Sequence, residues 1–187
     1  PLLARHPDAG SAHGNVLEIG PDDQPRRERL LKPRPAYQGP DDALKAAVHG
    51  YRVAANIILY RRTALESIGY FTNRPEYTED YDSAIALAAA GWGNCHARKT
   101  VARYRVWVDP AGIRPRRKRA EVRGLTHIFG TTLARAFEDR HWPPAPIRRR
   151  RRVLALRQSD CLKSSHWEES EKRELAEALK RLGDSRL

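Results

Sequence analysis

The chain has 187 residues, with 35 Lys and Arg against 23 Asp and Glu and a formal net charge of +12. This length suits one domain, or one domain with a tail, and the charge favours anionic partners: phosphorylated molecules, an acidic membrane surface or nucleic acid. The two cysteines, Cys95 and Cys161, fit no disulfide framework or zinc-ligand spacing, and no apolar run is long enough to cross a bilayer. We therefore expect a cytoplasmic protein, with peripheral attachment to the inner face of the cell membrane kept open.

The first part of the chain alternates strand-like and helix-like segments. Residues 13–19 predict a strand, and residues 20–38, rich in Pro, Asp and Arg, predict an exposed loop. Residues 41–48 predict a short helix. Residues 53–60 are apolar and β-branched, which predicts a largely buried strand, and a short helix over 63–68 follows it.

A helix with an acidic first turn comes next. Thr78 can cap a helix over residues 79–90, and Gly91 would stop it. Residues 101–108 then return to strand. This mixed order predicts an α/β domain over residues 1–108.

Residues 109–187 predict a basic helical extension. Apolar residues recur with helical spacing from Val122 to Phe137, and Gly130 is a weak point in that pattern. A helix from Arg148 through Leu162 and an amphipathic helix over 168–182 follow. The last helix could either dock on the protein or lie on a surface.

Three sequence pieces carry a family resemblance by their order and spacing. They are an Arg-Arg-x-Ala-Leu-Glu-x-Ile-Gly run from Arg61 to Gly69, then Glu79-Asp80-x-Asp82, and then Tyr104-Arg105. In this order they resemble the second, acceptor-side half of family 2 glycosyltransferases of the GT-A type. The resemblance covers about residues 1–107. It implies a partial GT-A, Rossmann-like mixed sheet with flanking helices, followed by a helical tail.

The resemblance also implies an activity. Such an enzyme transfers a sugar, with inversion, from a nucleotide-sugar donor to a hydroxyl of a glycan or a lipid-linked acceptor, as in the synthesis of cell-envelope polysaccharide, and the complete enzyme uses Mg²⁺ or Mn²⁺. The chemistry needs a carboxylate within reach of the acceptor hydroxyl. Asp80 suits this role because a helix N-terminus favours its ionised form, and the family motif points to the same residue. Glu79 would support it.

Further residues are candidates for contacts with the acceptor or the donor diphosphate. These are Asn56, Arg61, Arg62, Tyr77, Asp82, Arg105 and Trp107. Plainer interpretations stay open: the acids could merely complement the helix dipole, and at least one of the paired arginines could cap backbone carbonyls. Trp107 stands where the family often has a His, and it could stack on a sugar or base but cannot ligate a metal.

The nucleotide-binding half of the family, with its metal-binding Asp-x-Asp, would lie upstream of Pro1. The pairs Asp22-Asp23 and Asp41-Asp42 do not replace it because neither follows a buried strand. We therefore interpret the chain as a fragment or processed piece that holds no metal ligands of its own. We expect it to bind a sugar nucleotide poorly and to show no turnover without the absent half.

A basic binding module without catalytic chemistry is the rival hypothesis. Basic runs over residues 114–119 and 148–152 could neutralise the phosphates of nucleic acid or of an anionic membrane surface. Nucleic acid is disfavoured because no helix-turn-helix or RNP-like pattern accompanies the runs. A solvated charged face is the plainest interpretation of the same residues.

Overall fold

The computed structural model describes residues 2–29, 34–50, 57–71, 77–106, 117–163 and 167–184. They form two compact units. The first holds the described residues up to 71 together with 83–106, and the second holds residues 77–82 together with the described residues from 117 onward. The predicted boundary near residue 108 separates the same parts of the chain, except that residues 77–82 make their contacts with the second unit.

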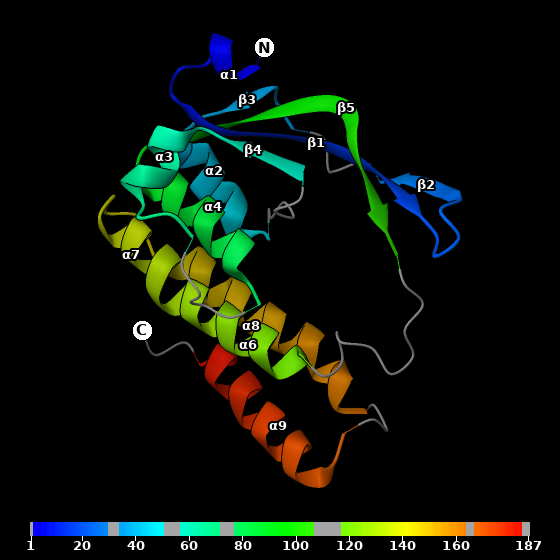
Figure 1. Ribbon diagram of the computed structural model, residues 1–187. Helices are drawn as coiled ribbons and strands as arrows, with labels where there is room; N and C mark the ends of the chain where they lie inside the picture. Colours follow the sequence, from blue (N-terminus) through cyan, green and yellow to red (C-terminus); the bar gives the residue numbers. More distant parts are fainter. Residues whose placement is uncertain are drawn as a thin grey trace. The chain divides into compact units, whose positions relative to one another are not determined.

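The first unit contains a five-stranded mixed sheet (Figure 1). Its strands are β1 (Ala9–Ile19), β2 (Pro25–Arg29), β3 (Tyr37–Gln38), β4 (Ile58–Tyr60) and β5 (Gly93–Arg105). β1 pairs in parallel with β5 and antiparallel with both β2 and β4, and β3 pairs antiparallel with β5. The predicted α/β class and mixed sheet are confirmed.

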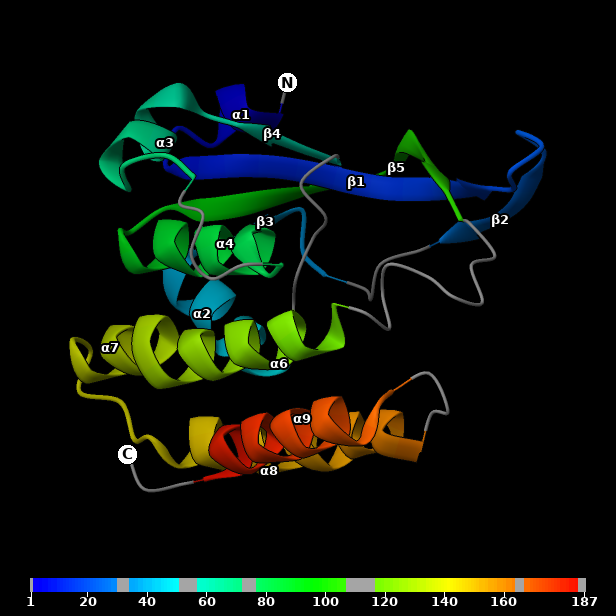
Figure 2. The ribbon, with the colours of Figure 1, turned by 60° about the horizontal axis from the view of Figure 1, so that its bottom comes forward.

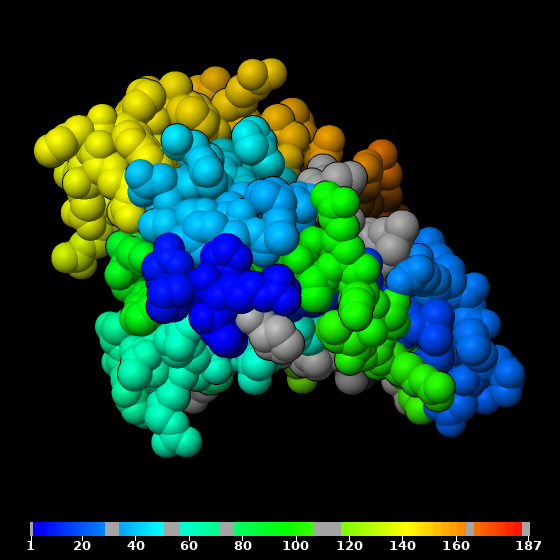
Figure 3. Space-filling view, turned by 90° about the horizontal axis from the view of Figure 1, so that it is seen from above, coloured from blue at the N-terminus to red at the C-terminus, as the bar shows by residue number. Residues whose placement is uncertain are grey.

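Within the described ranges, the helices that accompany this sheet are α1 (Leu2–Arg5), α2 (Pro40–Val48), α3 (Arg62–Ser67) and α4 (Glu79–Ala89), whose first turn belongs to the second unit. Figure 2 shows α2 and the later turns of α4 beneath the same face of the sheet. Their buried side chains include Leu44, Val48, Ile85 and Leu87. Figure 3 shows α1 on the surface, in dark blue, and this helix contacts both β1 and β5.

Glycines end three of the predicted helices where expected. Gly50 follows α2 with φ 85°, Gly69 follows α3 with φ 72°, and Gly91 follows α4 with φ 90°. A residue without a Cβ adopts this left-handed conformation at little cost, so each glycine stops its helix and turns the chain. The three helix predictions are therefore confirmed to within a residue or two at each end.

The strand predictions needed four corrections. The strand predicted over 13–19 is the later part of β1, which begins at Ala9. The loop predicted over 20–38 contains β2 and β3, because the charged β2 has no apolar pattern and forms by pairing with the second half of β1. β4 is short and its Leu59 is 67% exposed, so it is not the largely buried strand predicted over 53–60, whose residues 53–56 lie outside the described part. The strand predicted from 101 is the end of β5, which begins at Gly93.

The second unit is helical. After residues 77–82 it contains α6 (Lys118–His127), the π-helical η2 (Ile128–Thr132), α7 (Leu133–Glu138), α8 (Ala145–Ser159), the 3₁₀ turn η3 (Asp160–Lys163) and α9 (Glu169–Gly183). The apolar residues of the predicted stripe, among them Val122, Phe129 and Leu133, are buried. Gly130, the weak point in the pattern, lies in the π-helical turn η2. In such a turn each backbone hydrogen bond spans five residues, one more than in an α-helix.

The terminal helix α9 docks within its own unit. Leu175, Leu179 and Leu182 are buried, and α9 packs against α6 and α8. Arg151 of α8 is only 3% exposed, and its guanidinium donates to the carbonyls of Leu182 and Arg181 at 2.9 and 2.8 Å. The basic run over 148–152 is thus not simply a solvated face, because Arg151 caps the end of α9. None of the described helices has the length and apolarity that spanning a membrane requires.

Candidate active site

The acidic residues Glu79, Asp80 and Asp82 all lie in the first turn of α4, as the sequence predicted. The Thr78 carbonyl accepts the amides of Tyr81 and Asp82 at 3.1 and 3.0 Å, which starts the helix. The Thr78 hydroxyl is buried and has no hydrogen-bond partner among the described residues, so the predicted side-chain cap is wrong. Instead, Asp80 Oδ1 accepts the Tyr81 amide at 2.7 Å, which holds that carboxylate at the helix start.

The three carboxylates have different surroundings. Glu79 is exposed, whereas Asp80 and Asp82 are half-buried. Asp82 Oδ1 accepts a hydrogen bond of 2.6 Å from the Thr132 hydroxyl of η2. Burial raises the pKa of Asp82, and the Thr132 hydrogen bond and the charge of His127 act against that rise. Asp82 is therefore bound into the helical unit, while Glu79 projects into solvent.

Aromatic packing fixes the position of this helix start. Tyr81, between the two aspartates, is 1% exposed and meets Phe129 edge to face, with ring centroids 6.3 Å apart. Such pairs contribute about 0.5–1.5 kcal/mol beyond their buried area. The contacts of Tyr81 and Asp82 explain why residues 77–82 belong to the helical unit.

Tyr77 precedes the acidic turn in a strained conformation. Its φ is 68°, in the left-handed region that non-glycine residues adopt at a cost of about 1–2 kcal/mol. The Arg117 guanidinium lies over its ring, 5.7 Å from the centroid. Strain of this kind is concentrated at functional sites, which keeps Tyr77 among the candidate residues.

The two adjacent arginines have different roles. Arg61 donates from Nε to the Ala9 carbonyl at 3.0 Å and from Nη2 to the carbonyls of Leu3 and His6 at 2.7 and 3.3 Å. It takes the carbonyl-capping role that the sequence left open for one of the pair. Arg62 is exposed and makes no hydrogen bond or ion pair within the described ranges, so its guanidinium is available to a ligand.

The Arg105 side chain binds the turn between β1 and β2. Its Nη1 donates to the carbonyls of Gly20 and Pro21 at 3.1 and 3.3 Å, and its Nη2 forms an ion pair with Asp23. The guanidinium thus holds the β1–β2 turn, and these contacts compete with the predicted diphosphate contact. The candidates Asn56 and Trp107 lie outside the described residues.

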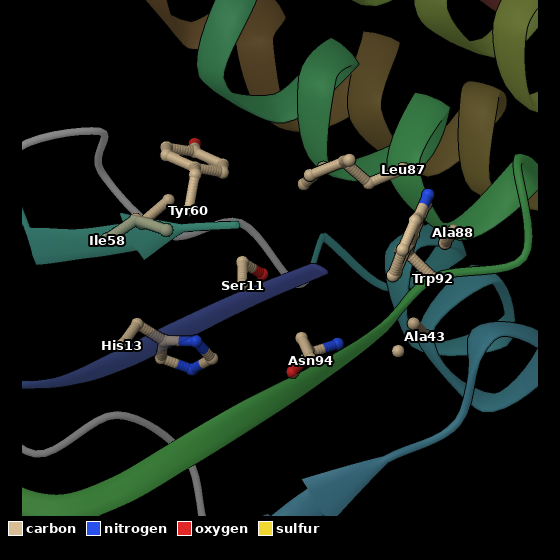
Figure 4. Close-up of a pocket in the computed structure, with 12 residues that line it drawn as sticks. Ser11, His13, Ala43, Ile58, Tyr60, Leu87, Ala88, Trp92 and Asn94 are labelled. Carbon is tan, nitrogen blue, oxygen red and sulfur yellow. The ribbon is translucent and has the colours of Figure 1, made fainter. Parts of the chain in front are cut away.

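A small cavity lies within the first unit, between the sheet and helices α2 and α4 (Figure 4). Ser11, His13 and Asn94 line it from the strands, and Leu87 and Ala88 line it from α4. Its volume of about 30 Å³ has room for a water molecule or two and is far too small for a sugar nucleotide. It is therefore not the donor site.

The structure also shows a buried histidine pair that sequence reasoning missed. His13 and His96 face each other across β1 and β5, both 5% exposed, with ring centroids 5.2 Å apart. Arg34 Nη1 donates to His13 Nε2 at 2.8 Å, and His96 Nε2 lies 3.3 Å from Asn15 Oδ1. Burial, followed by the charge of Arg34, lowers the pKa of His13 to about 3 and also lowers that of His96. Both rings are therefore neutral at pH 7.

Within the described ranges, no three or more His, Cys, Asp or Glu side chains are grouped so that they could hold a metal ion. Comparisons with known proteins give no further identification: no family model matches the chain, and no curated protein or solved structure shows significant similarity to it.

Proposed function

We propose that the chain is the acceptor-side half of an inverting glycosyltransferase of the GT-A type. The order of elements supports the proposal. The resemblance implies a strand, an Arg-Arg helix, an acidic helix and a further strand, and the chain has β4, α3, α4 and β5 in that order. β4 and β5 flank β1 in one mixed sheet.

The observation that carries the proposal is the placement of Asp80. It lies in the first turn of an 11-residue helix, and the Tyr81 amide binds its Oδ1. An ionised carboxylate offers about four lone-pair sites on its two oxygens, so a carboxylate that accepts one amide can still take up a proton. A helix N-terminus favours the ionised form, which is the form that a general base needs.

In the proposed step, Asp80 takes the proton of the acceptor hydroxyl as that oxygen attacks the anomeric carbon. The bond from that carbon to the nucleoside diphosphate breaks, and the diphosphate leaves with the bonding electron pair. One carboxylate is enough, because the leaving group needs no proton. Arg62, exposed beside the sheet, is the arginine of the pair that we assign to an anionic group of the substrate.

The remaining candidates have supporting roles. Asp82 holds the helix start through Thr132, and Glu79 is exposed in the same turn. Tyr77, half-buried and with its backbone in the left-handed region, precedes that turn. The Mg²⁺ or Mn²⁺ of such enzymes has no ligand set among the described residues. No step is therefore assigned to the cation.

The proposal is tested by assaying nucleoside diphosphate release. The chain, joined to the nucleotide-binding half that the proposal expects before it, is incubated with a panel of nucleotide sugars, with membrane or glycan extracts as acceptors, in the presence of Mg²⁺ or Mn²⁺. We expect acceptor-dependent release with at least one donor. Absence of release with every donor, from a folded protein, would favour the rival binding module.

A further inference from the structure

A groove between α6 and α9 of the helical unit is lined by several arginines. Its volume is about 640 Å³. The charged residues that line it are Arg119 and Arg123 of α6 and Arg173, Glu174, Glu177 and Arg181 of α9. Only Arg119 lies in one of the basic runs noted in the sequence. The other groove residues did not stand out, because they belong to two helices that begin at 118 and 169, 51 residues apart along the chain.

The charges of this groove are unbalanced. Arg119 forms an ion pair with Glu174, which ties the two helices together and cancels both charges. Arg123, Arg173 and Arg181 are exposed and form no ion pair within the described part of the chain. Glu177 is the one other acid in the lining. Three guanidinium groups thus face one carboxylate, and the groove carries a net charge of about +2.

The groove is held open by the core beneath it. Leu175 and Leu179 of α9 and Val122 of α6 are buried, so the outward side chains of the two helices are fixed at their bases. The capping box at the start of α9, formed by Glu168 and Glu171, orders the helix end from which Arg173 projects. The arginines therefore stand on two rigid, packed helices and not on a loop.

We infer that this groove binds a phosphate or diphosphate group. A guanidinium group is planar and can donate two parallel N–H hydrogen bonds to two oxygens of one phosphate. Several guanidinium groups around one site can neutralise a doubly charged anion. An excess of about two positive charges corresponds to one such group. Thr126 also lines the groove, but its hydroxyl donates to the Val122 carbonyl, so the arginines supply the donors for the phosphate oxygens. The ligand is the head group of a lipid or a soluble phosphorylated compound.

The inference does not depend on sugar transfer, and it is tested with the chain as it stands. The groove variant carries Arg123→Gln and Arg173→Gln. The matched control carries Arg149→Gln and Arg157→Gln, two exposed arginines of α8 that lose the same charge away from the groove. A third variant, Glu177→Gln, removes the opposing charge. Circular dichroism checks that all three variants fold.

Two probes distinguish the sources of the phosphate. Binding of inorganic pyrophosphate is measured by calorimetry, and binding to vesicles of phosphatidic acid in phosphatidylcholine is measured by flotation. We expect the groove variant to bind at least about tenfold more weakly, the control to change less than about twofold, and Glu177→Gln to bind more tightly. Groove-dependent pyrophosphate binding supports a soluble ligand, and groove-dependent binding to vesicles alone supports a head group.

Two results would overturn the inference. One is that the unmodified chain binds neither probe. The other is that the groove variant and the control lose binding equally, because the effect would then follow from net charge alone.

Discussion

The hydroxyl of Thr132, in the π-helical turn η2, donates a hydrogen bond of 2.6 Å to the carboxylate of Asp82, in the first turn of α4. The two residues are 50 positions apart in sequence. The bond fastens the acidic turn to the helical unit, at a place where a wider turn of helix supplies the donor.

Thr132→Val should destabilise the protein, because the half-buried Asp82 loses its donor. We expect the free energy of unfolding at pH 7 to fall by about 1–3 kcal/mol, measured by urea denaturation. The exposed neighbour gives a matched control: Thr131→Val should change it by less than about 0.5 kcal/mol.

The pH dependence of the stability of the same variant follows from the direction in which the pKa of Asp82 is shifted. The pKa of folded Asp82 is raised above its ordinary value of 3.8, so its contribution to stability falls as the pH rises through the folded pKa. Removing the Thr132 bond raises that pKa further. The difference in free energy of unfolding between Thr132→Val and the unmodified protein should therefore be smaller at about pH 4 than at pH 7. An equal difference at both pH values would contradict a hydrogen bond from Thr132 to ionised Asp82.

Asp80→Asn tests the proposed base in the complete protein. The amide oxygen of Asn can still accept the Tyr81 N–H, so folding should be preserved, while the transfer rate should fall by about two or more orders of magnitude. Asp42→Asn changes an exposed acid in the first turn of α2 and serves as the control. Turnover by Asp80→Asn close to that of the control would rule out this assignment.

Substitutions of Arg61 and Arg62 should have different effects on stability. Arg61→Gln removes donors to three carbonyls and should lower the free energy of unfolding by about 1–3 kcal/mol. Arg62→Gln should leave it within about 0.5 kcal/mol and instead weaken substrate binding, seen as a raised KM. Thermal unfolding and steady-state kinetics on both variants give the comparison, and equal destabilisation by the two would refute the division of roles.

His13 should make the protein sensitive to acid. Its folded pKa of about 3 lies below the unfolded value of 6.5, so the unfolded state binds the extra proton and stability falls as the pH drops from about 6.5 toward 3. His13→Gln should reduce the loss of stability between pH 7.5 and 5, measured by urea denaturation at each pH. The exposed His49→Gln should leave the loss unchanged, and a result in which both variants behave alike would disprove the role of His13.

Local patterns in the sequence determined the helices. Gly50, Gly69 and Gly91 mark helix ends because only glycine takes the left-handed conformation cheaply, and the apolar spacing from Val122 to Phe137 needed no distant partner to be recognised. The acidic turn from Glu79 to Asp82 was found in the same way. The sequence alone therefore placed the candidate base on its helix.

The tertiary structure decided what depends on residues far apart in the chain. β2 is a strand only because β1 pairs with it, and His13 meets His96 only through the parallel register of β1 and β5. Arg61 and Arg62 have the same chemistry, yet one reaches three carbonyls and the other faces solvent. The basic run over 148–152 suggested an anion surface, but packing buries Arg151, and the arginines that line a groove come from α6 and α9. Such outcomes follow from strand pairing and helix packing, which no local pattern of residues encodes.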